Sequence, residues 1–340
     1  MTELEATVFN CLYPWHMTEF DLIASYFTRP AKKAVLGVGD DCAIINQSPG
    51  TQLAISSDML VEGRHFFHDV SPCSLGHKAL AVNLSDLAAC GATPVAFTLA
   101  LALPCIDEAW LQQFSRGLLA LADAHGCELI GGDTTQGPLN ICITVFGEVP
   151  RGQALLRSGA QVGDDIYVSG TLGDARLALE ALQGKIELPA DILAQARLRL
   201  ELPTPRVALG TALRGIATSA IDISDGLAGD LGHILKASAV GAQIDTAITI
   251  TLIAACARID WATGTFDSQD RLKMAFSGGD DYELAFTAPP AARQSVEAAA
   301  ASSQTPVTRI GVIEAEPGLR LVDGDGHPVA TSFASFNHFA

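Results

Sequence analysis

The sequence predicts a mixed α/β (α+β) fold divided into two domains. The chain has 340 residues, whereas one domain takes roughly 150, and both halves mix strand-like and helix-like patterns. The segment 149–152 (Val-Pro-Arg-Gly) is the best boundary, because proline and glycine favour turns. We therefore expect an N-terminal domain over residues 1–149 and a C-terminal domain over residues 150–340.

The clearest element of the first half is a helix over residues 107–125. Asp107 suits its N-cap and Gly126 its end. Its apolar stripe consists of Trp110, Leu111, Phe114, Leu118 and Leu121. Apolar periodicity predicts the other elements in chain order: a helix at 17–29, strands at 34–38, 42–46 and 52–57, a helix at 74–91, and strands at 95–102, 127–130 and 140–147.

The same periodicity predicts the second half. Its elements are a strand at 165–169, helices near 173–183, 190–201 and 205–215, a strand at 219–223, a helix after Gly226, strands near 242–246 and 283–287, a helix at 291–302 and two final strands. Strands and helices alternate here too, which favours an α/β or α+β domain.

The charge balance excludes several classes of partner. Lys and Arg number 21 and Asp and Glu 38, for a net charge of −17, whereas a nucleic-acid binder needs a basic face and a polybasic membrane anchor needs clustered cations. The longest apolar stretch, near residues 95–103, is about half of the ~20 residues that a membrane-spanning helix needs. The acidic N-terminus lacks the regions of a signal peptide. We expect a cytoplasmic protein without nucleic-acid or membrane partners.

Composition and cysteine spacing narrow the class further. Apolar residues make up 49% of the chain and charged residues 17%, which excludes intrinsic disorder. The eight cysteines never form Cys-x-x-Cys and mostly lie among apolar or small residues. This pattern predicts buried free thiols rather than a zinc site or disulfides.

Acidic residues recur in segments where an apolar, strand-like run ends in Gly or Ser and then Asp. The carboxylates of these segments are Asp40, Asp41, Asp58, Asp133, Asp222, Asp225, Asp280 and Asp281. A further acid, Asp86, lies in a helical stretch. One such motif alone is most simply a turn. Together they predict a metal–phosphate site, because Mg²⁺ prefers oxygen ligands and shares them with substrate phosphates.

Motifs of other phosphate-handling and hydrolytic enzymes are absent from the sequence. It contains no P-loop, no dinucleotide fingerprint, no zinc-protease motif, no nucleophile elbow and no kinase catalytic loop. Phosphate would then be bound by carboxylate-held metal ions and by helix N-termini, as at Ser224-Asp-Gly226, where a helix opens with free N–H groups.

Six segments, in order and with compatible spacing, resemble thiamine-monophosphate kinases over nearly the whole chain. They are 39–43 (Gly-Asp-Asp-Cys-Ala), 56–66, 78–89, 129–135, 222–227 and 277–284. The resemblance implies the superfamily of aminoimidazole ribonucleotide synthetase, selenophosphate synthetase and a hydrogenase-maturation protein, with a two-domain PurM-like fold. It also implies a homodimer whose N-terminal domains pair into a shared β-barrel, and ATP bound at the cleft between the domains.

The activity that this resemblance implies is Mg²⁺-dependent transfer of the ATP γ-phosphate to thiamine monophosphate, giving thiamine diphosphate and ADP. By the same resemblance, several Mg²⁺ ions per active site bind Asp41, Ser56, Ser57, Asp58, Asp86, Asp133, Asp222 and Asp225. The implied ATP contacts are Gly132, Asp133, Arg157 and Ser224, and the implied substrate contacts are His65, Asp280 and Phe336. The acceptor phosphate, with a second pKa of about 6, is largely ionised at pH 7. We therefore expect direct transfer without a catalytic general base.

Three positions differ from the commonest family pattern. Asp280 stands where glutamate is more frequent, and its shorter side chain implies a longer or water-mediated contact. Ser57 stands where threonine is common, and Phe336 where tyrosine or tryptophan also occurs.

Three alternatives remain open from the sequence. Another ATP-using member of the superfamily, such as a selenophosphate synthetase, would need a reactive Cys or selenocysteine in a Gly-rich N-terminal segment, and Cys11 lies in no such segment. A metal-dependent phosphatase would hydrolyse its substrate with paired ions and need no acceptor. A non-catalytic divalent-ion binder would gain thermal stability from Mg²⁺ without turnover.

Overall fold

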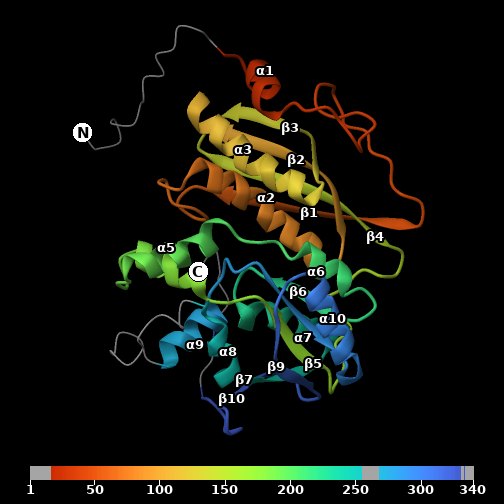
Figure 1. Ribbon diagram of the computed structural model, residues 1–340, viewed down its shortest axis with the longest axis vertical. Coiled ribbons are helices and arrows are strands. Elements are labelled where there is room, and N and C mark those ends of the chain that lie inside the picture. The colour runs from red at the N-terminus through yellow and green to blue at the C-terminus, as the bar shows by residue number, and fades with distance from the viewer. Residues whose placement is uncertain (1–16, 255–267, 331–332, 334–340) are drawn as a thin grey trace. The chain divides into compact units, whose positions relative to one another are not determined.

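The computed structural model describes residues 17–254, 268–330 and 333 and contains two compact units (Figure 1). Unit 1 comprises Met1–Asn46, Ser57–Ala79 and Ala96–Thr144, and unit 2 comprises Gln47–Ser56, Leu80–Val95 and Val145–Ala340. Helices and strands occur in both units. The predicted mixed α/β fold class is therefore confirmed.

Four strands of the first half form one sheet. They are β1 (Thr51–Val61), β2 (Thr93–Leu103), β3 (Glu128–Gln136) and β4 (Asn140–Pro150), in the order β1-β4-β2-β3. Strands β2 and β3 run parallel. The helical elements of this half are α1 (Glu19–Leu22), the π-helical turn η2 (Ile23–Phe27), α2 (Pro72–Ala89) and α3 (Glu108–His125).

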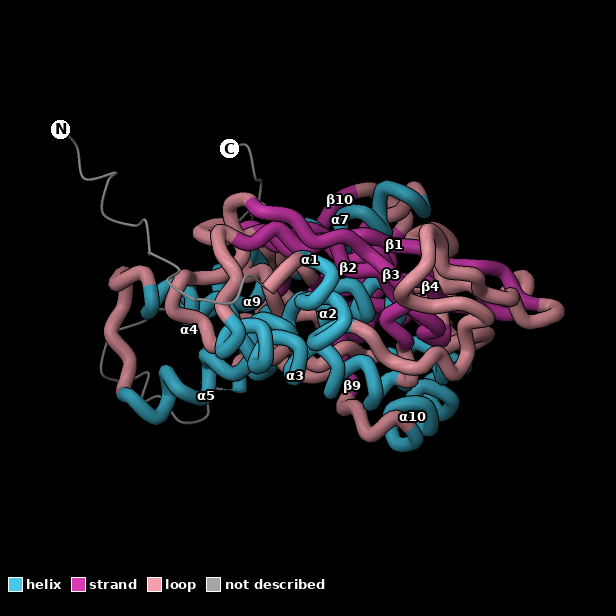
Figure 2. Tube along the Cα trace, turned by 90° about the horizontal axis from the view of Figure 1, so that it is seen from above, coloured by secondary structure: helices cyan, strands magenta, loops and turns pink. Residues whose placement is uncertain are grey.

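Helices α2 and α3 lie side by side, as Figures 1 and 2 both show. A Cβ added at Gly76 would lie 2.1 Å from the Phe114 carbonyl oxygen, and one at Gly117 would lie 1.9 Å from that of Cys73. Only glycine permits this backbone approach. The predicted caps of α3 are confirmed, since the Asp107 carboxylate accepts a hydrogen bond from the Trp110 N–H at 3.0 Å and Gly126 is left-handed at φ 57°.

Six strands of unit 2 form a second, mixed sheet. They are β5 (Asp165–Ser169), β6 (Ser219–Ile223), β7 (Gly241–Asp245), β8 (Glu283–Ala288), β9 (Val307–Glu314) and β10 (Gly318–Val322), in the order β10-β7-β9-β5-β8-β6. The β10–β7 pair is parallel and the other pairs are antiparallel. Every residue of β5, β6 and β8 is buried. Both faces of these three strands are therefore covered by other parts of the protein.

The second half of the described chain also contains helices. They are α4 (Asp174–Leu182), α5 (Ala190–Glu201), α6 (Val207–Ala212), α7 (Leu227–Ser238), α8 (Thr246–Thr249), α9 (Ser268–Ser277) and α10 (Arg293–Ser302), with 3-10 turns at Ile250–Leu252 and Pro290–Ala292. Helix α7 contacts β6, β8, β10 and α9. The connection from β6 to α7 is therefore held on several sides, and it carries two of the predicted site residues, Ser224 and Asp225.

The strands predicted at 34–38 and 42–46 are wrong. This segment forms only isolated bridges, Leu36 with Ile44 and Val38 with Asp40. Gly39 takes a positive φ of 118° and reverses the chain so soon that no ladder can extend.

Three other predicted boundaries are wrong where an acid follows an apolar run. Strand β1 continues past Asp58 to Val61, and β3 continues past Asp133 to Gln136. The apolar run before Asp280 belongs to helix α9 and not to a strand. Strand β4 extends to Pro150, so the expected domain boundary falls at the end of a strand.

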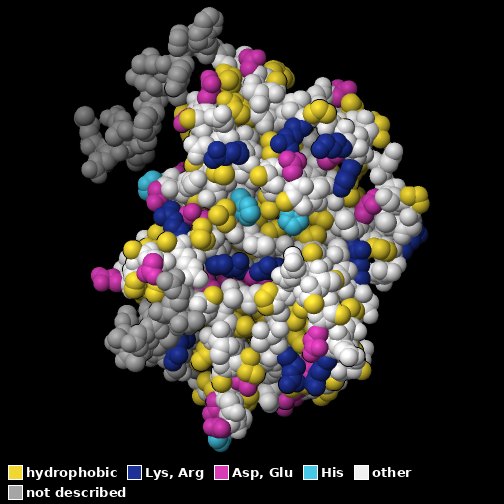
Figure 3. Space-filling model, in the orientation of Figure 1, with side chains coloured by type: hydrophobic (Ala, Val, Ile, Leu, Met, Phe, Trp, Pro, Cys, Tyr) yellow, Lys and Arg dark blue, Asp and Glu magenta, His cyan; other side chains and the backbone are white. Residues whose placement is uncertain are grey.

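The cysteines are less buried than their sequence context predicts. Six are described and all are free, but only Cys127 is buried. On the face drawn in Figure 3, acidic side chains lie in small separate groups rather than in one patch. Within the described part of the chain, every helix is too short or too polar to span a membrane.

Candidate functional site

A pocket of about 640 Å³ in unit 1 brings together three predicted residues, Asp41, Gly132 and Asp133. Its lining combines acids and glycines with apolar side chains of η2, including Ile23 and Phe27. A Cβ added at Gly132 would lie 1.8 Å from the Leu99 carbonyl oxygen, so glycine is required there. The pocket can therefore hold a ligand with an apolar part and a charged part.

The four acids that line this pocket are exposed: Glu19, Asp40, Asp41 and Asp133. The Asp40 carboxylate accepts a hydrogen bond from the Asp41 N–H at 2.8 Å. Asp40 thus shapes the turn, while Asp41 and Asp133 are the two predicted metal ligands that line this pocket.

Strand β1 separates the predicted ligands Ser56 and Asp58 from Ser57. Side chains alternate along a strand, so Ser56 and Asp58 share a face with buried Leu60. Ser57 points to the opposite face, where its Oγ lies 3.2 Å from the Ile143 carbonyl oxygen. The structure therefore does not bring the Ser57 side chain together with the other two.

A cluster in unit 2 joins Ser56, Asp86 and Asp222 through helix α2. The Ser56 hydroxyl donates to Asp86 Oδ2 at 2.5 Å, and the hydroxyl of the neighbouring Ser85 donates to Asp222 Oδ2 at 2.8 Å. Burial raises the pKa of Asp86, while the hydrogen bond from Ser56 and the positive charge of Arg157 lower it. These carboxylate and hydroxyl oxygens are the donor types that Mg²⁺ prefers.

The turn from β6 to α7 does not offer its N–H groups to a ligand, contrary to the expectation for Ser224-Asp-Gly226. The Ser224 and Asp225 N–H groups donate to Asp230 Oδ2 at 3.1 and 3.0 Å. Burial raises the pKa of Asp230 to about 7, although these hydrogen bonds lower it. Asp230 is not among the residues predicted from the sequence, and its only local signal is an acid in the first turn of a helix.

Asp280 lies against the same turn. Its N–H donates to the Ser224 carbonyl oxygen at 2.9 Å, and the Tyr282 N–H donates to that of Ile223 at 2.8 Å. Asp280 and Tyr282 take left-handed φ values of 66° and 51°, which are uncommon for residues other than glycine. The structure thus brings Ser224, Asp225 and Asp280 together.

His65 lies in the turn that follows β1. Its Nδ1 accepts a hydrogen bond from the Val61 N–H at 3.0 Å, so the neutral ring carries its proton on Nε2. The buried Lys78 ammonium donates to the His65 carbonyl oxygen at 3.2 Å. Phe336 lies outside the described residues.

Two acids next to Asp280 have internal partners. Asp281 accepts hydrogen bonds from the Gly173 N–H at 2.9 and 3.1 Å, and burial raises its pKa well above the usual range. Glu283, with no exposed surface, accepts from Arg199 at 2.7 Å and from Arg206 at 2.5 Å. These acids stabilise the loop that carries Asp280.

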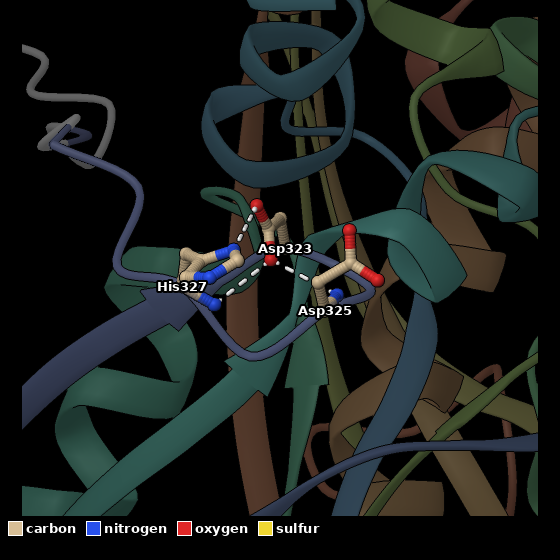
Figure 4. A group of neighbouring side chains, drawn as sticks. All are labelled: Asp323, Asp325 and His327. Atoms are coloured by element: carbon tan, nitrogen blue, oxygen red, sulfur yellow. Dashed lines mark hydrogen bonds and ion pairs between the residues drawn. The ribbon is translucent and has the colours of Figure 1, made fainter.

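A second acidic group lies in the exposed turn after β10 (Figure 4). Asp323, Asp325 and His327 approach one another there. Asp323 Oδ1 already accepts hydrogen bonds from the Asp325 and His327 N–H groups at 3.0 and 2.8 Å. These bonds account for the turn, and we assign no metal to it.

Two family models match most of the chain. The N-terminal-domain model of AIR synthase related protein matches residues 39–149, and the corresponding C-terminal-domain model matches residues 161–324. The chain thus contains the N-terminal and C-terminal domains of an AIR synthase related protein.

Closer relatives identify the family within that class. Thiamine-monophosphate kinase of Salmonella typhimurium is 47% identical over 330 residues, covering 95% of this chain and 98% of its own. The crystal structure of thiamine-monophosphate kinase from Stenotrophomonas maltophilia K279a matches with a TM-score of 0.78 and 45% identity, covering 87% and 92% of the two chains. AaThiL complexed with AMPPCP and TMP matches with a TM-score of 0.73 and 28% identity, covering 86% and 89%. The chain belongs to the thiamine-monophosphate kinase family.

Proposed function

We propose that this chain transfers the γ-phosphate of ATP to thiamine monophosphate, giving thiamine diphosphate and ADP. The observation that carries the proposal is the 47% identity over 95% of the chain to a thiamine-monophosphate kinase. The complex of AaThiL with AMPPCP and TMP supports the same pair of substrates. Neither a phosphatase nor a sister synthetase receives comparable support.

The chain would hold Mg²⁺ through Asp41, Ser56, Asp58, Asp86, Asp133, Asp222 and Asp225. The donor set supports this, because it consists of carboxylates and a hydroxyl, and Ser56 already meets Asp86 at 2.5 Å. Bound Mg²⁺ would neutralise the charge that gathers when ATP and a second phosphate meet in an acidic protein. Ser57 could join this set only through its main chain, because its side chain lies on the other face of β1.

ATP would occupy the pocket of unit 1 and contact Gly132 and Asp133. The pocket volume of about 640 Å³ falls within the usual range for small-molecule sites. The side chains of Arg157 and Ser224 would provide further contacts, since the Ser224 N–H is already bonded to Asp230.

Thiamine monophosphate would be held by His65, Asp280 and Phe336. An imidazole N–H is a suitable hydrogen-bond donor for a phosphate oxygen, which supports the role given to His65. No side chain need remove a proton, since the acceptor phosphate is largely ionised at neutral pH. The residues would instead hold the two phosphates in line.

We also propose a cytoplasmic homodimer in which the N-terminal domains, residues 1–149, pair into a shared β-barrel, with residues 150–340 as the C-terminal domain. One face of β1 exposes Leu53, Ile55 and Met59 at 40%, 59% and 52%. Exposed apolar side chains along one strand face favour burial against a second copy.

The proposed function is tested by ³¹P NMR of the purified protein with ATP, Mg²⁺ and thiamine monophosphate. Matched tubes lack the acceptor or contain EDTA. We expect thiamine diphosphate and ADP to appear together, only in the complete mixture. Equal consumption of ATP without the acceptor would contradict the proposal and favour a hydrolase.

A further inference from the structure

Asp230 is a buried carboxylate that points back toward the turn preceding its own helix. It lies in the first turn of α7 and is 3% exposed. Its Oδ2 accepts from two successive N–H groups, those of Ser224 and Asp225, at 3.1 and 3.0 Å. One side-chain oxygen therefore ties two successive residues of the turn to the first turn of α7.

The restrained turn also fixes a second loop. The Ser224 carbonyl oxygen accepts from the Asp280 N–H at 2.9 Å. A Cβ added at Gly279 would lie 2.5 Å from that same oxygen, so the two loops meet backbone to backbone. A shift of Ser224 would therefore move Asp280 as well.

Asp230 further decides which groups of the turn remain available to a ligand. N–H groups ahead of a helix normally attract phosphate, but here the N–H groups of Ser224 and Asp225 are occupied by Asp230. The side chains of Ser224 and Asp225 are left to face the ligand. Metal ligands commonly depend on such outer partners for their orientation.

We propose that Asp230 is a positioning residue of the phosphoryl-transfer site. It orients Ser224 and Asp225 toward Mg²⁺ and ATP and, through Ser224, sets the place of Asp280. The identity of these ligands rests on the proposed function. The positioning role itself rests on the contacts of Asp230.

The test compares Asp230→Asn with a matched control, Asp164→Asn. Asp164 is another 3% exposed aspartate of unit 2, and it accepts hydrogen bonds from the Gln161 N–H at 2.9 Å and the Thr218 hydroxyl at 2.6 Å. Both variants keep the side-chain shape and remove one buried carboxylate. Of these two aspartates, only Asp230 accepts hydrogen bonds from Ser224 and Asp225.

Calorimetry with Mg²⁺ and a non-hydrolysable ATP analogue measures binding without turnover. Steady-state assays give the KM for ATP and the Mg²⁺ concentration at half-maximal rate, and thermal melting gives Tm. For Asp230→Asn we expect analogue affinity to fall and the Mg²⁺ midpoint to rise by roughly 10- to 100-fold, as for other partners of metal ligands. Asp164→Asn should lower Tm and leave both quantities at their wild-type values.

Wild-type affinity and an unchanged Mg²⁺ midpoint in folded Asp230→Asn would overturn the positioning role. Equal shifts in Asp164→Asn would also overturn it, because they would show a general loss of stability. If Asp230→Asn does not fold, Asp230→Glu, which displaces the charge by one methylene, is measured against the same expectation. If the wild-type protein binds the analogue but forms no thiamine diphosphate, the proposed function fails while the binding comparison still decides the role of Asp230.

Discussion

The carboxylates of the unit 1 pocket and those of the β6–α7 region of unit 2 follow the same sequence pattern but lie in opposite environments. Asp41 and Asp133 are exposed at the pocket. Asp222 and Asp281 are 6% and 1% exposed, and each already accepts a hydrogen bond from the protein. The recurring acidic segments therefore do not distinguish, by sequence, an acid that awaits a ligand from one that organises a loop. Burial and partners make that distinction.

Asp133→Asn should have the largest effect on activity. It removes a charge from the pocket, so we expect kcat/KM for ATP to fall about 100- to 1,000-fold, which is the usual loss when one group that stabilises the transition state is removed. Stability should change by less than about 0.5 kcal/mol because the side chain is exposed. Steady-state kinetics and urea unfolding measure the two effects. A large loss of stability would show that Asp133, like the buried acids of unit 2, holds the structure together.

Glu283→Gln should chiefly lower stability. Arg199 and Arg206 would lose the carboxylate that pairs with both of them in the buried site, and breaking such a pair costs about 3 kcal/mol. Urea denaturation followed by circular dichroism measures this cost. A variant as stable as the wild-type protein would show that the buried acids of this region do not hold it together.

His65→Ala should raise the KM for thiamine monophosphate about tenfold, the value of one hydrogen bond to a charged group. The KM for ATP should change little, because His65 does not line the pocket of unit 1. Initial rates with each substrate varied in turn separate the two constants. An increase confined to the KM for ATP would reverse the assignment of His65.

Asp165→Asn should give the smallest effect, a loss of stability at neutral pH that disappears in acid, because both arginines that pair with Asp165 are half-exposed. The hydrogen bond from Arg293, followed by that from Arg309, lowers the pKa of Asp165 from 3.8 despite burial. A lowered pKa in the folded state contributes stability that is present above pH 3.8 and is lost as the pH falls through the lower folded value. Acid unfolding of Asp165→Asn should show a weaker pH dependence below pH 4 than the wild-type protein, with unchanged activity at pH 7. Identical acid unfolding curves for Asp165→Asn and the wild-type protein would show that Asp165 makes no such contribution to stability.

The sequence predicts the fold best where the signals are local. Helix α3 carries its N-cap, stripe and terminal glycine within residues 107–126, and the structure confirms it. The strand expected over residues 275–277 is wrong, because a short apolar segment fits a strand or a helix equally well. The packing of α9 against α7 favours the helix. Strand β3 continues through two glycines because parallel pairing with β2 holds them.

The candidate site is predictable in its residue types but not in its partners. The resemblance names Asp86 and Asp222, yet Ser85, which bonds to Asp222, has no distinguishing sequence feature. Asp230 acts across a turn whose φ values bring residue 230 back to 224 and 225. Such contacts depend on backbone geometry, which no spacing rule in the sequence encodes.

Because the cysteines differ in burial, alkylating reagents should modify some of them in preference to others. Burial raises the pKa of the Cys127 thiol to about 12, so it stays protonated and inert toward alkylating reagents. Cys42 is exposed and lies between Asp41 and Ala43, both of which line the pocket of unit 1. A fluorophore attached at Cys42, with exposed Cys90 replaced, would lie at the rim of the pocket and report its filling as a change in emission.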